Sequence, residues 1–404
     1  MADIFQKCLD YQDADNIKRV GLYPYFHTLE SKQAPEVIME GKRRIMLGSN
    51  NYLGLTTHPD VMKAAKEAID KYGTGCSGSR FLNGTLDEHI VLEEEIRDFV
   101  GKEAALVFST GYGSNLGILS AIAGRHDYLI CDKEDHASIY AGCQLSYAEM
   151  KRYNHNDMKD LEKVLKKLPE DSGKLIVVDG VFSMGGDYAN LPEIVRLAKK
   201  YGARTMVDDA HALGISGEGG RGSAWHFNLQ NDIDIFMGTF SKSLASLGGY
   251  VAASERVINY LKHNSRPFIF TASNPPSATA AALAALRVLK AHPELPLRVN
   301  ELGDYCRKAL TDRGVVIRDS EAPIIPIPSR DMTTTATINK MLYEEGVFVN
   351  CVFPPAVDPE DCLIRVSLMA TLTESLIDEA ADKIAKVFKK LGLLKNQQNK
   401  GDKV

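Results

Sequence analysis

Two neighbouring stretches, TMVDDAH at 205–211 and DIFMGTFSK at 234–242, each consist of a short apolar run followed at once by polar side chains. Such continuous apolar runs are typical of strands that are buried on both faces of a parallel sheet. Ligands of these sheets bind beyond the carboxyl ends of the strands, so the residues after each run are the candidates for function. Four more runs of the same kind are AALVF at 104–108, YLIC at 128–131, KLIVVD at 174–179 and YVAA at 250–253.

Helical patterns separate these runs. Apolar residues recur at helical spacing over 156–168 and 191–201, and Gly202 stands where the second helix should end. Strands that alternate with helices predict an α/β fold with a mainly parallel, doubly wound sheet, which we expect to form a large domain over 59–290.

The pattern changes near residue 290. Helix, strand, helix, strand and helix then follow in turn, which predicts a smaller C-terminal α+β domain over 291–394, with Pro293 and Pro296 marking a linker. Thr373 is the expected N-cap of the last helix. An N-terminal segment at 1–58 and a flexible tail at 395–404 complete the predicted organisation.

Composition excludes several classes of protein. The 404 residues include 48 basic and 53 acidic side chains, a net charge of −5, and 44% are hydrophobic, as in ordinary globular proteins. Without a basic stripe we expect small-molecule partners, no nucleic acid and no integral membrane contact. Seven scattered cysteines without a C-x-x-C pair predict reduced thiols, and the N-terminus lacks the apolar core of a signal peptide. These features favour a cytoplasmic protein.

The residues that follow the apolar runs suit one cofactor. A carboxylate such as Asp208 can keep a pyridine nitrogen protonated, while a lysine such as Lys242 forms a Schiff base with an aldehyde. Ser109-Thr110-Gly111-Tyr112-Gly113 follows another run and precedes a helical pattern, which is typical of a phosphate cradle. Pyridoxal 5'-phosphate (PLP) needs all three features. Hydroxyl donors from Thr239 and Ser241, and a His136 ring that lies flat on the pyridine, would complete the site.

Each residue also has a simpler interpretation. Asp208 and His211 could be a hydrogen-bonded pair or half of a metal site, Lys242 a solvated lysine, His136 a helix cap and Gly111 a turn former. Their joint placement after strands favours the PLP interpretation. Two G-x-G-x-x-G strings, at 73–78 and 217–222, lack the strand and helix context that a dinucleotide site requires.

These residues belong to a longer series of motifs that resembles the α-oxoamine synthase family of PLP enzymes. The resemblance covers residues 20–392 and implies the fold type I, aminotransferase-like architecture. The motifs are NNYLG at 50–54, GSRFLNGT at 78–85, DHAS at 135–138, DGVFSM at 179–184, DDAH at 208–211, GTFSK at 238–242 and RVSL at 365–368.

The resemblance implies a catalytic role for four residues and no metal. Lys242 would form the Schiff base and transfer protons, and Asp208 would pair with the pyridine nitrogen. His211 would contact the ring hydroxyl, whereas His136 would stack on the ring and also contact the substrate.

The resemblance further implies a homodimer with active sites at the subunit interface. Arg365 would anchor the carboxylate of an amino acid with the help of Asn51, because the arginine fork suits a carboxylate. The alternative for Arg365 is an ordinary ion pair between domains. The remaining cofactor contacts would be Gly111, Tyr112, Ser183, Thr239, Ser241 and, from the partner subunit, Thr271.

Branches of this family differ in their substrates. The segment 238–243 and the following Gly248-Gly249-Tyr250 look most like the branch that condenses L-serine with palmitoyl-CoA or another long-chain acyl-CoA to 3-ketosphinganine, CoA and CO2, the first step of sphingolipid synthesis. The alternatives are the branches that join glycine to acetyl-CoA or alanine to a pimeloyl thioester. Asn51 is an aspartate in the alanine-using branch. An aminotransferase or decarboxylase on the same fold stays open, and a noncatalytic partner subunit would typically lack Lys242.

Overall fold

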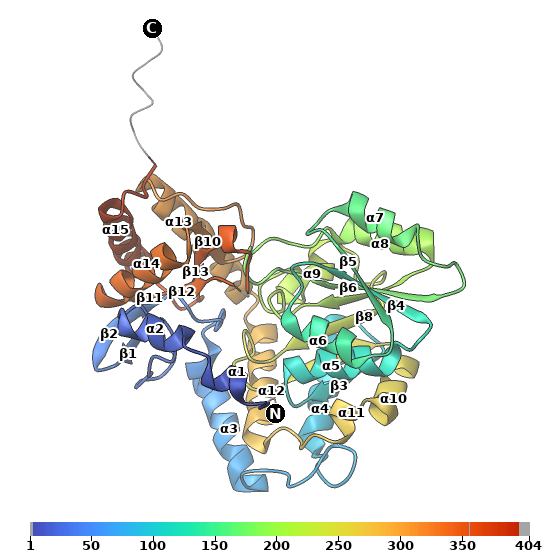
Figure 1. The fold of residues 1–404 in the computed structure, drawn as a ribbon. Coiled ribbons are helices and arrows are strands. Elements are labelled where there is room, and N and C mark those ends of the chain that lie inside the picture. The colour runs from blue at the N-terminus through green and yellow to red at the C-terminus, as the bar shows by residue number, and fades with distance from the viewer. Residues whose placement is uncertain (1–2, 355, 396–404) are drawn as a thin grey trace.

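A seven-stranded sheet forms the centre of the larger part of the protein (Figure 1). The computed structural model describes residues 3–354 and 356–395. The sheet order is β3-β9-β8-β7-β6-β4-β5, in which β9 runs antiparallel to its two neighbours and the other adjacent pairs are parallel. The strands are β3 (Ala104–Phe108), β4 (Asp127–Asp132), β5 (Glu149–Tyr153), β6 (Gly173–Asp179), β7 (Arg204–Asp208), β8 (Ile235–Thr239) and β9 (Gly249–Ala253).

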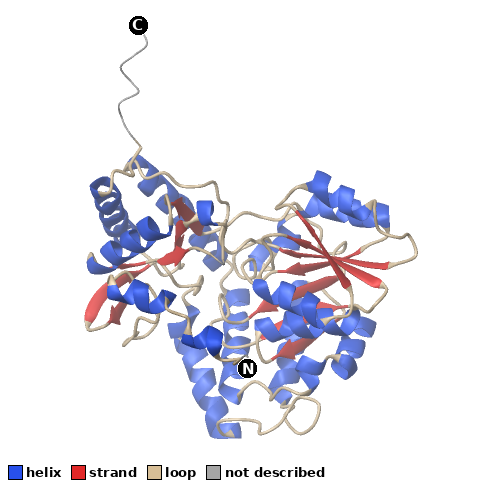
Figure 2. Ribbon diagram, viewed as in Figure 1, coloured by secondary structure: helices blue, strands red, loops and turns tan. Residues whose placement is uncertain are grey.

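Helices cover both faces of this sheet (Figure 2). Alternate residues of one strand enter different cores: Leu129 and Cys131 pack on one face and Ile130 on the other. Burial on both faces explains why the strands are continuous apolar runs. One face carries α5 (Gly111–Ile122), α6 (Ala137–Leu145), α10 (Glu255–Asn264) and α11 (Arg266–Ile269). The other carries α4 (Asp87–Val100), α7 (Met158–Leu165), α8 (Leu191–Tyr201), α9 (Ser223–His226) and α12 (Pro276–Ala291).

The predicted doubly wound, mainly parallel sheet is confirmed. All six apolar runs lie in strands, and α8 ends where expected because Gly202 adopts a left-handed conformation with φ of 63°. Strand β5 was not predicted, because it lies at the sheet edge and its residues EMKRY are mostly polar. The helix expected at 156–168 is shorter, because α7 begins after its N-cap Asp157 and ends at Leu165.

Two small sheets lie in the other part of the protein. One joins β1 (Glu36–Met39) and β2 (Lys42–Met46) to β11 (Val347–Phe348), so an N-terminal strand pairs with a C-terminal one, side by side in Figure 1. The other has the order β10-β13-β12. The remaining elements are β10 (Ile324–Pro328), β12 (Asn350–Val352), β13 (Leu363–Ser367), α1 (Gln6–Leu9), α2 (Asp13–Arg19), α3 (Pro59–Tyr72), α13 (Glu294–Asp312), α14 (Met332–Glu344) and α15 (Glu374–Lys390).

The linker interpretation of the prolines is wrong. Pro293 is the N-cap of α13 and Pro296 lies in its first turn, where proline costs no helical hydrogen bond. Thr373 does cap α15, because its side chain accepts a hydrogen bond from the Leu376 amide. The domain limits stay predictions, and all of the predicted tail except Lys395 lies outside the described residues.

Candidate active site

A cavity of about 290 Å³ opens at the carboxyl ends of the central strands. It contains most of the residues that the sequence singled out. Two larger depressions, of about 550 and 620 Å³, are lined by none of those residues. The predicted residues that line the cavity are Gly111, Tyr112, His136, Asp208, His211, Thr239, Ser241 and Lys242.

The cradle for an anion forms where α5 begins. Thr110 caps this helix, and its hydroxyl accepts a hydrogen bond from the Gly113 amide at 2.9 Å. The first amides of a helix have no partner within the helix and attract anions. A Cβ on Gly111 would lie 2.7 Å from Thr239 Oγ1, so only glycine lets the backbone approach this closely. The Thr239 and Ser241 hydroxyls, 2.9 Å apart, line the cavity next to this glycine.

Asp208 lies at the end of β7 and is held by two donors. Its Oδ1 accepts a hydrogen bond from the Ala210 amide at 2.9 Å, and its Oδ2 accepts one from Asn115 Nδ2 at 2.7 Å. The same Asn115 nitrogen donates to Ser138 at 2.8 Å, whereas the buried Asn115 Oδ1 has no partner. These two hydrogen bonds fix the Asp208 carboxylate at the cavity wall. Among the described residues, no three His, Cys, Asp or Glu side chains gather where they could hold a metal ion.

Lys242 lines the cavity three residues after β8. Burial lowers the pKa of its amine to about 8, although the Asp208 and Asp179 carboxylates act in the opposite direction. A lysine with a lowered pKa supplies neutral amine near physiological pH, which Schiff-base formation requires. The cavity position disfavours the solvated-lysine interpretation.

His136 both caps a helix and lines the cavity. It caps α6, as the simpler interpretation suggested, with its Nδ1 2.7 Å from the Ser138 hydroxyl. Its ring also lines the cavity, edge-to-face with Tyr112 at 6.4 Å between ring centroids. Desolvation, with the nearby positive charge of Lys242, lowers the pKa of His136, which favours a neutral ring.

A hydrogen-bond chain joins His211 to Arg365 through Tyr52. The Tyr52 hydroxyl lies 2.7 Å from His211 Nδ1 and accepts a hydrogen bond from Arg365 Nη2 at 3.2 Å. Burial, with the charges of Lys242 and Arg365, lowers the pKa of His211 well below its usual value. His211 is therefore neutral.

Arg365 is buried, with 4% of its surface exposed, yet its other hydrogen bonds also go to uncharged groups. Its Nε donates to the Ser183 carbonyl at 2.6 Å and its Nη1 to Asn50 Oδ1 at 3.1 Å. These contacts are not the interdomain ion pair considered as the alternative. Burying an unpaired charge is costly, so the guanidinium suits an anionic ligand.

Besides Arg365, three further predicted residues, Asn51, Ser183 and Thr271, are not among those that line the cavity. Asn51 Nδ2 donates to Thr56 at 2.7 Å, and its neighbour Asn50 contacts Arg365 instead. Ser183 contributes its carbonyl to Arg365, and Thr271 is exposed. The predicted roles of Asn51, Ser183 and Thr271 stay predictions.

Asn115, Tyr52 and Asp179 belong to the site but were not predicted from the sequence. Asn115 had a detectable signal, because it is a lone amide within the otherwise small or apolar residues of GYGSNLGILSAI. Tyr52 and Asp179 lie in motifs that were recognised, but no local pattern indicates their partners. Burial, with the neighbouring Asp208, raises the pKa of Asp179 well above its usual value.

The residues present fit PLP on three counts. A buried carboxylate, a lysine and an anion cradle surround one cavity, and the glycine at the cradle leaves room that a Cβ would fill. PLP is the cofactor that uses this combination.

Comparison with known proteins supports the same conclusion. The family model for aminotransferase class I and II matches residues 42–384. A serine palmitoyltransferase of Bacteroides thetaiotaomicron is 52% identical over 389 residues, which cover 96% of this chain and 99% of the relative. An 8-amino-7-oxononanoate synthase of Thermoanaerobacter pseudethanolicus is 42% identical over 381 residues, 94% of this chain and 96% of the relative.

A solved structure extends this similarity to three dimensions. The serine palmitoyltransferase of S. paucimobilis with a bound PLP-myriocin aldimine has a TM-score of 0.94 and 37% identity, over 97% of this chain and 100% of that one. The matched family model, the relatives and this structure agree in indicating a PLP-dependent enzyme of this fold. The chain therefore belongs to the aminotransferase class I and II family, within its α-oxoamine synthase group of PLP-dependent acyltransferases.

Proposed function

We propose that this protein condenses L-serine with a long-chain acyl-CoA such as palmitoyl-CoA, releasing CoA and CO2 and giving 3-ketosphinganine, which begins sphingolipid synthesis. The proposal rests on the environment of Arg365, because its guanidinium is buried and all of its hydrogen-bond partners are uncharged. A substrate carboxylate would supply the missing negative charge, and every amino-acid substrate has one. The choice of serine is supported by the relative that is 52% identical.

The proposed roles of the chain's own residues follow from their positions. PLP, when bound, would accept the electron pair left on the amino acid after a proton or CO2 departs. Lys242 Nζ would take the proton from the serine α-carbon, because its lowered pKa makes neutral amine available. Asp208 would stabilise positive charge on the pyridine nitrogen, with Asn115 holding its carboxylate in place.

The two histidines would act as uncharged groups. His211 would face the ring hydroxyl with its Nε2, since Nδ1 is already engaged by Tyr52. His136 would cover the ring, and the Ser138 contact would keep it there. The amides at the start of α5, with Thr239 and Ser241, would hold the phosphate.

An acyl chain needs an apolar wall. Aromatic and apolar residues of the chain that could form this wall are Tyr23, Tyr25, Phe26, Leu82, Phe353 and Pro354-Pro355, of which Pro355 lies outside the described residues. Tyr25 packs edge-to-face on both Tyr23 and Phe353, with ring centroids 5.6 and 6.0 Å apart. Each buried methylene contributes about 0.8 kcal/mol, so selectivity should rise with chain length until the apolar wall is filled.

We also infer a cytoplasmic homodimer. Phe81, Leu82 and Phe270 are 50, 77 and 80% exposed, and large exposed apolar side chains often mark an interface. Thr271 adjoins Phe270 and would reach the phosphate of the partner subunit. The seven free cysteines fit a reducing compartment. None of the helices in the described part of the chain is both long and apolar enough to cross a membrane.

The test is a CoA-release assay over a grid of amino acids and acyl thioesters. We expect the highest kcat/KM with L-serine and palmitoyl-CoA. Higher values for alanine with a pimeloyl thioester would favour the alternative 8-amino-7-oxononanoate synthase reaction, which the 42% identical relative supports. Higher values for glycine with acetyl-CoA would also overturn the choice of substrates, and no CoA release from any pair would indicate an aminotransferase or decarboxylase.

A further inference from the structure

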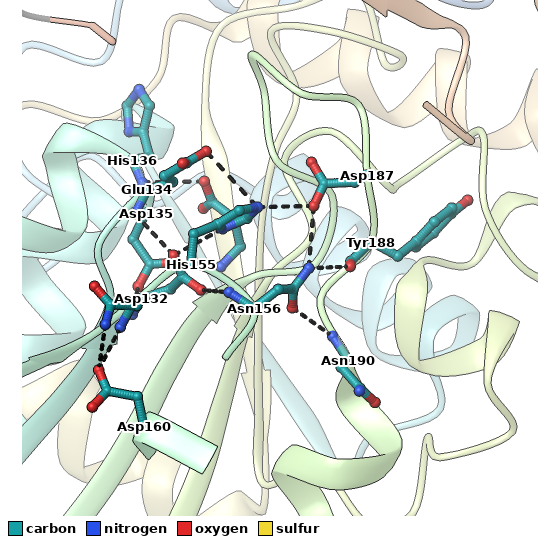
Figure 3. A network of polar contacts seen from close by, with 12 residues as sticks. Asp132, Glu134, Asp135, His136, His155, Asn156, Asp160, Asp187, Tyr188 and Asn190 are labelled. Atoms are coloured by element: carbon teal, nitrogen blue, oxygen red, sulfur yellow. Dashed lines mark hydrogen bonds and ion pairs between the residues drawn. The ribbon is translucent and has the colours of Figure 1, made fainter. Parts of the chain in front are cut away.

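A cluster of charged side chains lies near the ends of three adjacent strands, close to the loop that carries His136 (Figure 3). His155 follows the edge strand β5, Asp132 ends β4, and Asp187 lies in the loop after β6. The His155 ring is located between the two aspartates: its Nδ1 is 3.0 Å from Asp132 Oδ1 and its Nε2 is 3.0 Å from Asp187 Oδ2. One ring therefore connects the ends of three strands.

The geometry favours a doubly protonated ring. A neutral imidazole has a single N–H, so one of the two carboxylates would face a lone pair. Glu134 adds a third carboxylate 3.8 Å from Nε2. Although burial lowers the pKa of His155, its hydrogen bonds to Asp132 and Asp187 raise it to about 10.

Asp132 connects His155 to the residue that covers the cavity. The Asp132 side chain is fully buried and also accepts a hydrogen bond from the Glu134 amide at 2.9 Å, in the loop that leads to His136. The Asp132 amide donates to Asp135 Oδ2 at 2.8 Å, and Asp135 Oδ1 accepts from the Asp179 amide at 2.9 Å. Asp179 Oδ2 in turn accepts from the His136 amide at 3.1 Å. These bonds fix the backbone of His136.

Asp187 connects His155 to the anchor for the substrate. The Asp187 carbonyl accepts a hydrogen bond from the Phe182 amide at 2.9 Å, which closes the turn that contains Ser183. The Ser183 carbonyl then accepts the 2.6 Å hydrogen bond from Arg365 Nε. The Phe182 ring packs edge-to-face on His155 itself, with ring centroids 4.4 Å apart.

We propose that His155 is a positioning residue: its imidazolium ties the loops after β4 and β6 together and thereby sets His136 against the cofactor and Ser183 against Arg365. An ordinary exposed ion pair would contribute little, but here removal of His155 leaves the buried Asp132 carboxylate without its counter-charge. The inference rests on the proposed roles of His136 and Arg365. It does not depend on which amino acid or acyl chain is used.

The test compares His155→Leu with the matched control Arg313→Leu in the full-length holoenzyme. Arg313 also bridges two carboxylates, those of Asp378 and Asp382, and its side chain is 26% exposed against 23% for His155. It lies at the end of α13, away from the cavity residues. Both variants should therefore lose stability, but only His155→Leu should alter the cofactor site.

Three readouts separate positioning from general stability. For His155→Leu we expect the Kd of PLP to rise about tenfold, the scale of a lost hydrogen bond to a charged group. We also expect a changed visible circular dichroism band of the bound cofactor and faster amide exchange in 133–139 and 182–187. Asp187→Asn keeps the contact between His155 and Asp132, so its Kd for PLP should rise less, by about threefold. This second variant tests the proposal if His155→Leu does not fold.

Unchanged PLP affinity, dichroism and local exchange in a folded His155→Leu protein would overturn the proposal. Equal changes in Arg313→Leu would do the same, because they would reflect stability alone. None of the three readouts uses serine or an acyl-CoA, so failure of this inference is distinguishable from failure of the proposed reaction.

Discussion

The hydroxyl of Tyr52 lies 2.7 Å from Nδ1 of His211, and both side chains are buried. The same hydroxyl accepts a hydrogen bond from Arg365, so one phenol connects the proposed cofactor contact to the proposed substrate anchor. Burial, opposed by the Arg365 charge, raises the pKa of Tyr52, which keeps the phenol protonated and able to donate to His211. This connection suggests a first test.

Tyr52→Phe should weaken serine binding by about tenfold, because Arg365 loses an acceptor and His211 loses its donor. The measurement is a spectral titration of the holoenzyme with serine. Tyr153→Phe is the matched control, since Tyr153 is also buried but its hydroxyl has no hydrogen-bond partner. Equal serine affinity in Tyr52→Phe and the control would show that the hydroxyl has no role in the site.

Lys242→Ala should abolish turnover and the borohydride-reducible link to PLP, because Lys242 is the lysine on the cavity wall. Mass spectrometry of the reduced protein identifies the labelled residue. Lys63→Ala, at a side chain that is 72% exposed on α3, should retain both properties. Labelling of a different lysine in the unmodified enzyme would disprove the assignment.

Asp208→Asn should still bind PLP but lose turnover by about 10²–10³-fold, because an amide cannot stabilise positive charge on the pyridine nitrogen by ion pairing. Asn115→Leu should show a smaller loss of turnover, since it removes one donor that orients the carboxylate. Cofactor absorbance and steady-state rates distinguish binding from turnover. Near-native rates in Asp208→Asn would exclude the proposed role.

Arg365→Ala should weaken serine binding by about ten- to a hundredfold, because the carboxylate loses charge-assisted hydrogen bonds. The KM for acyl-CoA should change far less. Arg318→Ala, which removes an ion pair to Asp361, is the control. Serine titration that matches the control would remove Arg365 from the site.

The stability contributed by His155 should depend on pH in a defined direction. The pKa of His155 in the folded protein, about 10, lies above the ordinary value of 6.5. Its protonation therefore stabilises the fold fully below pH 6.5, and this contribution disappears as the pH rises through about 10. The groups that face the ring are Asp132, Asp187 and Glu134.

The melting temperature of the apoenzyme, compared with that of His155→Leu between pH 6 and pH 10.5, measures this effect. The difference between the two proteins should shrink towards high pH. A difference that stays constant across this range would mean that the ring contributes by packing rather than by charge.

The fold and the principal chemistry could be predicted from local sequence. Runs such as KLIVVD are buried on both faces, and that burial is a property of the few residues within the run. The acid at the end of β7 and the lysine after β8 follow from such runs, because a parallel sheet brings its carboxyl ends to one edge. The local pattern was insufficient for β5, whose edge position permits the charged residues of EMKRY.

Only the tertiary structure determined the partners of the polar groups. Tyr52 and Arg365 are 313 residues apart in the chain, and their contact depends on how the N-terminal segment packs with the C-terminal strands. His155 joins Asp132 to Asp187 because β5 lies next to β4, an adjacency that no apolar pattern encodes. The spacing of apolar residues in the sequence shows which face of a strand or helix is buried. A hydrogen bond between side chains that are distant in the chain forms only when the packed structure brings its donor and acceptor to about 3 Å.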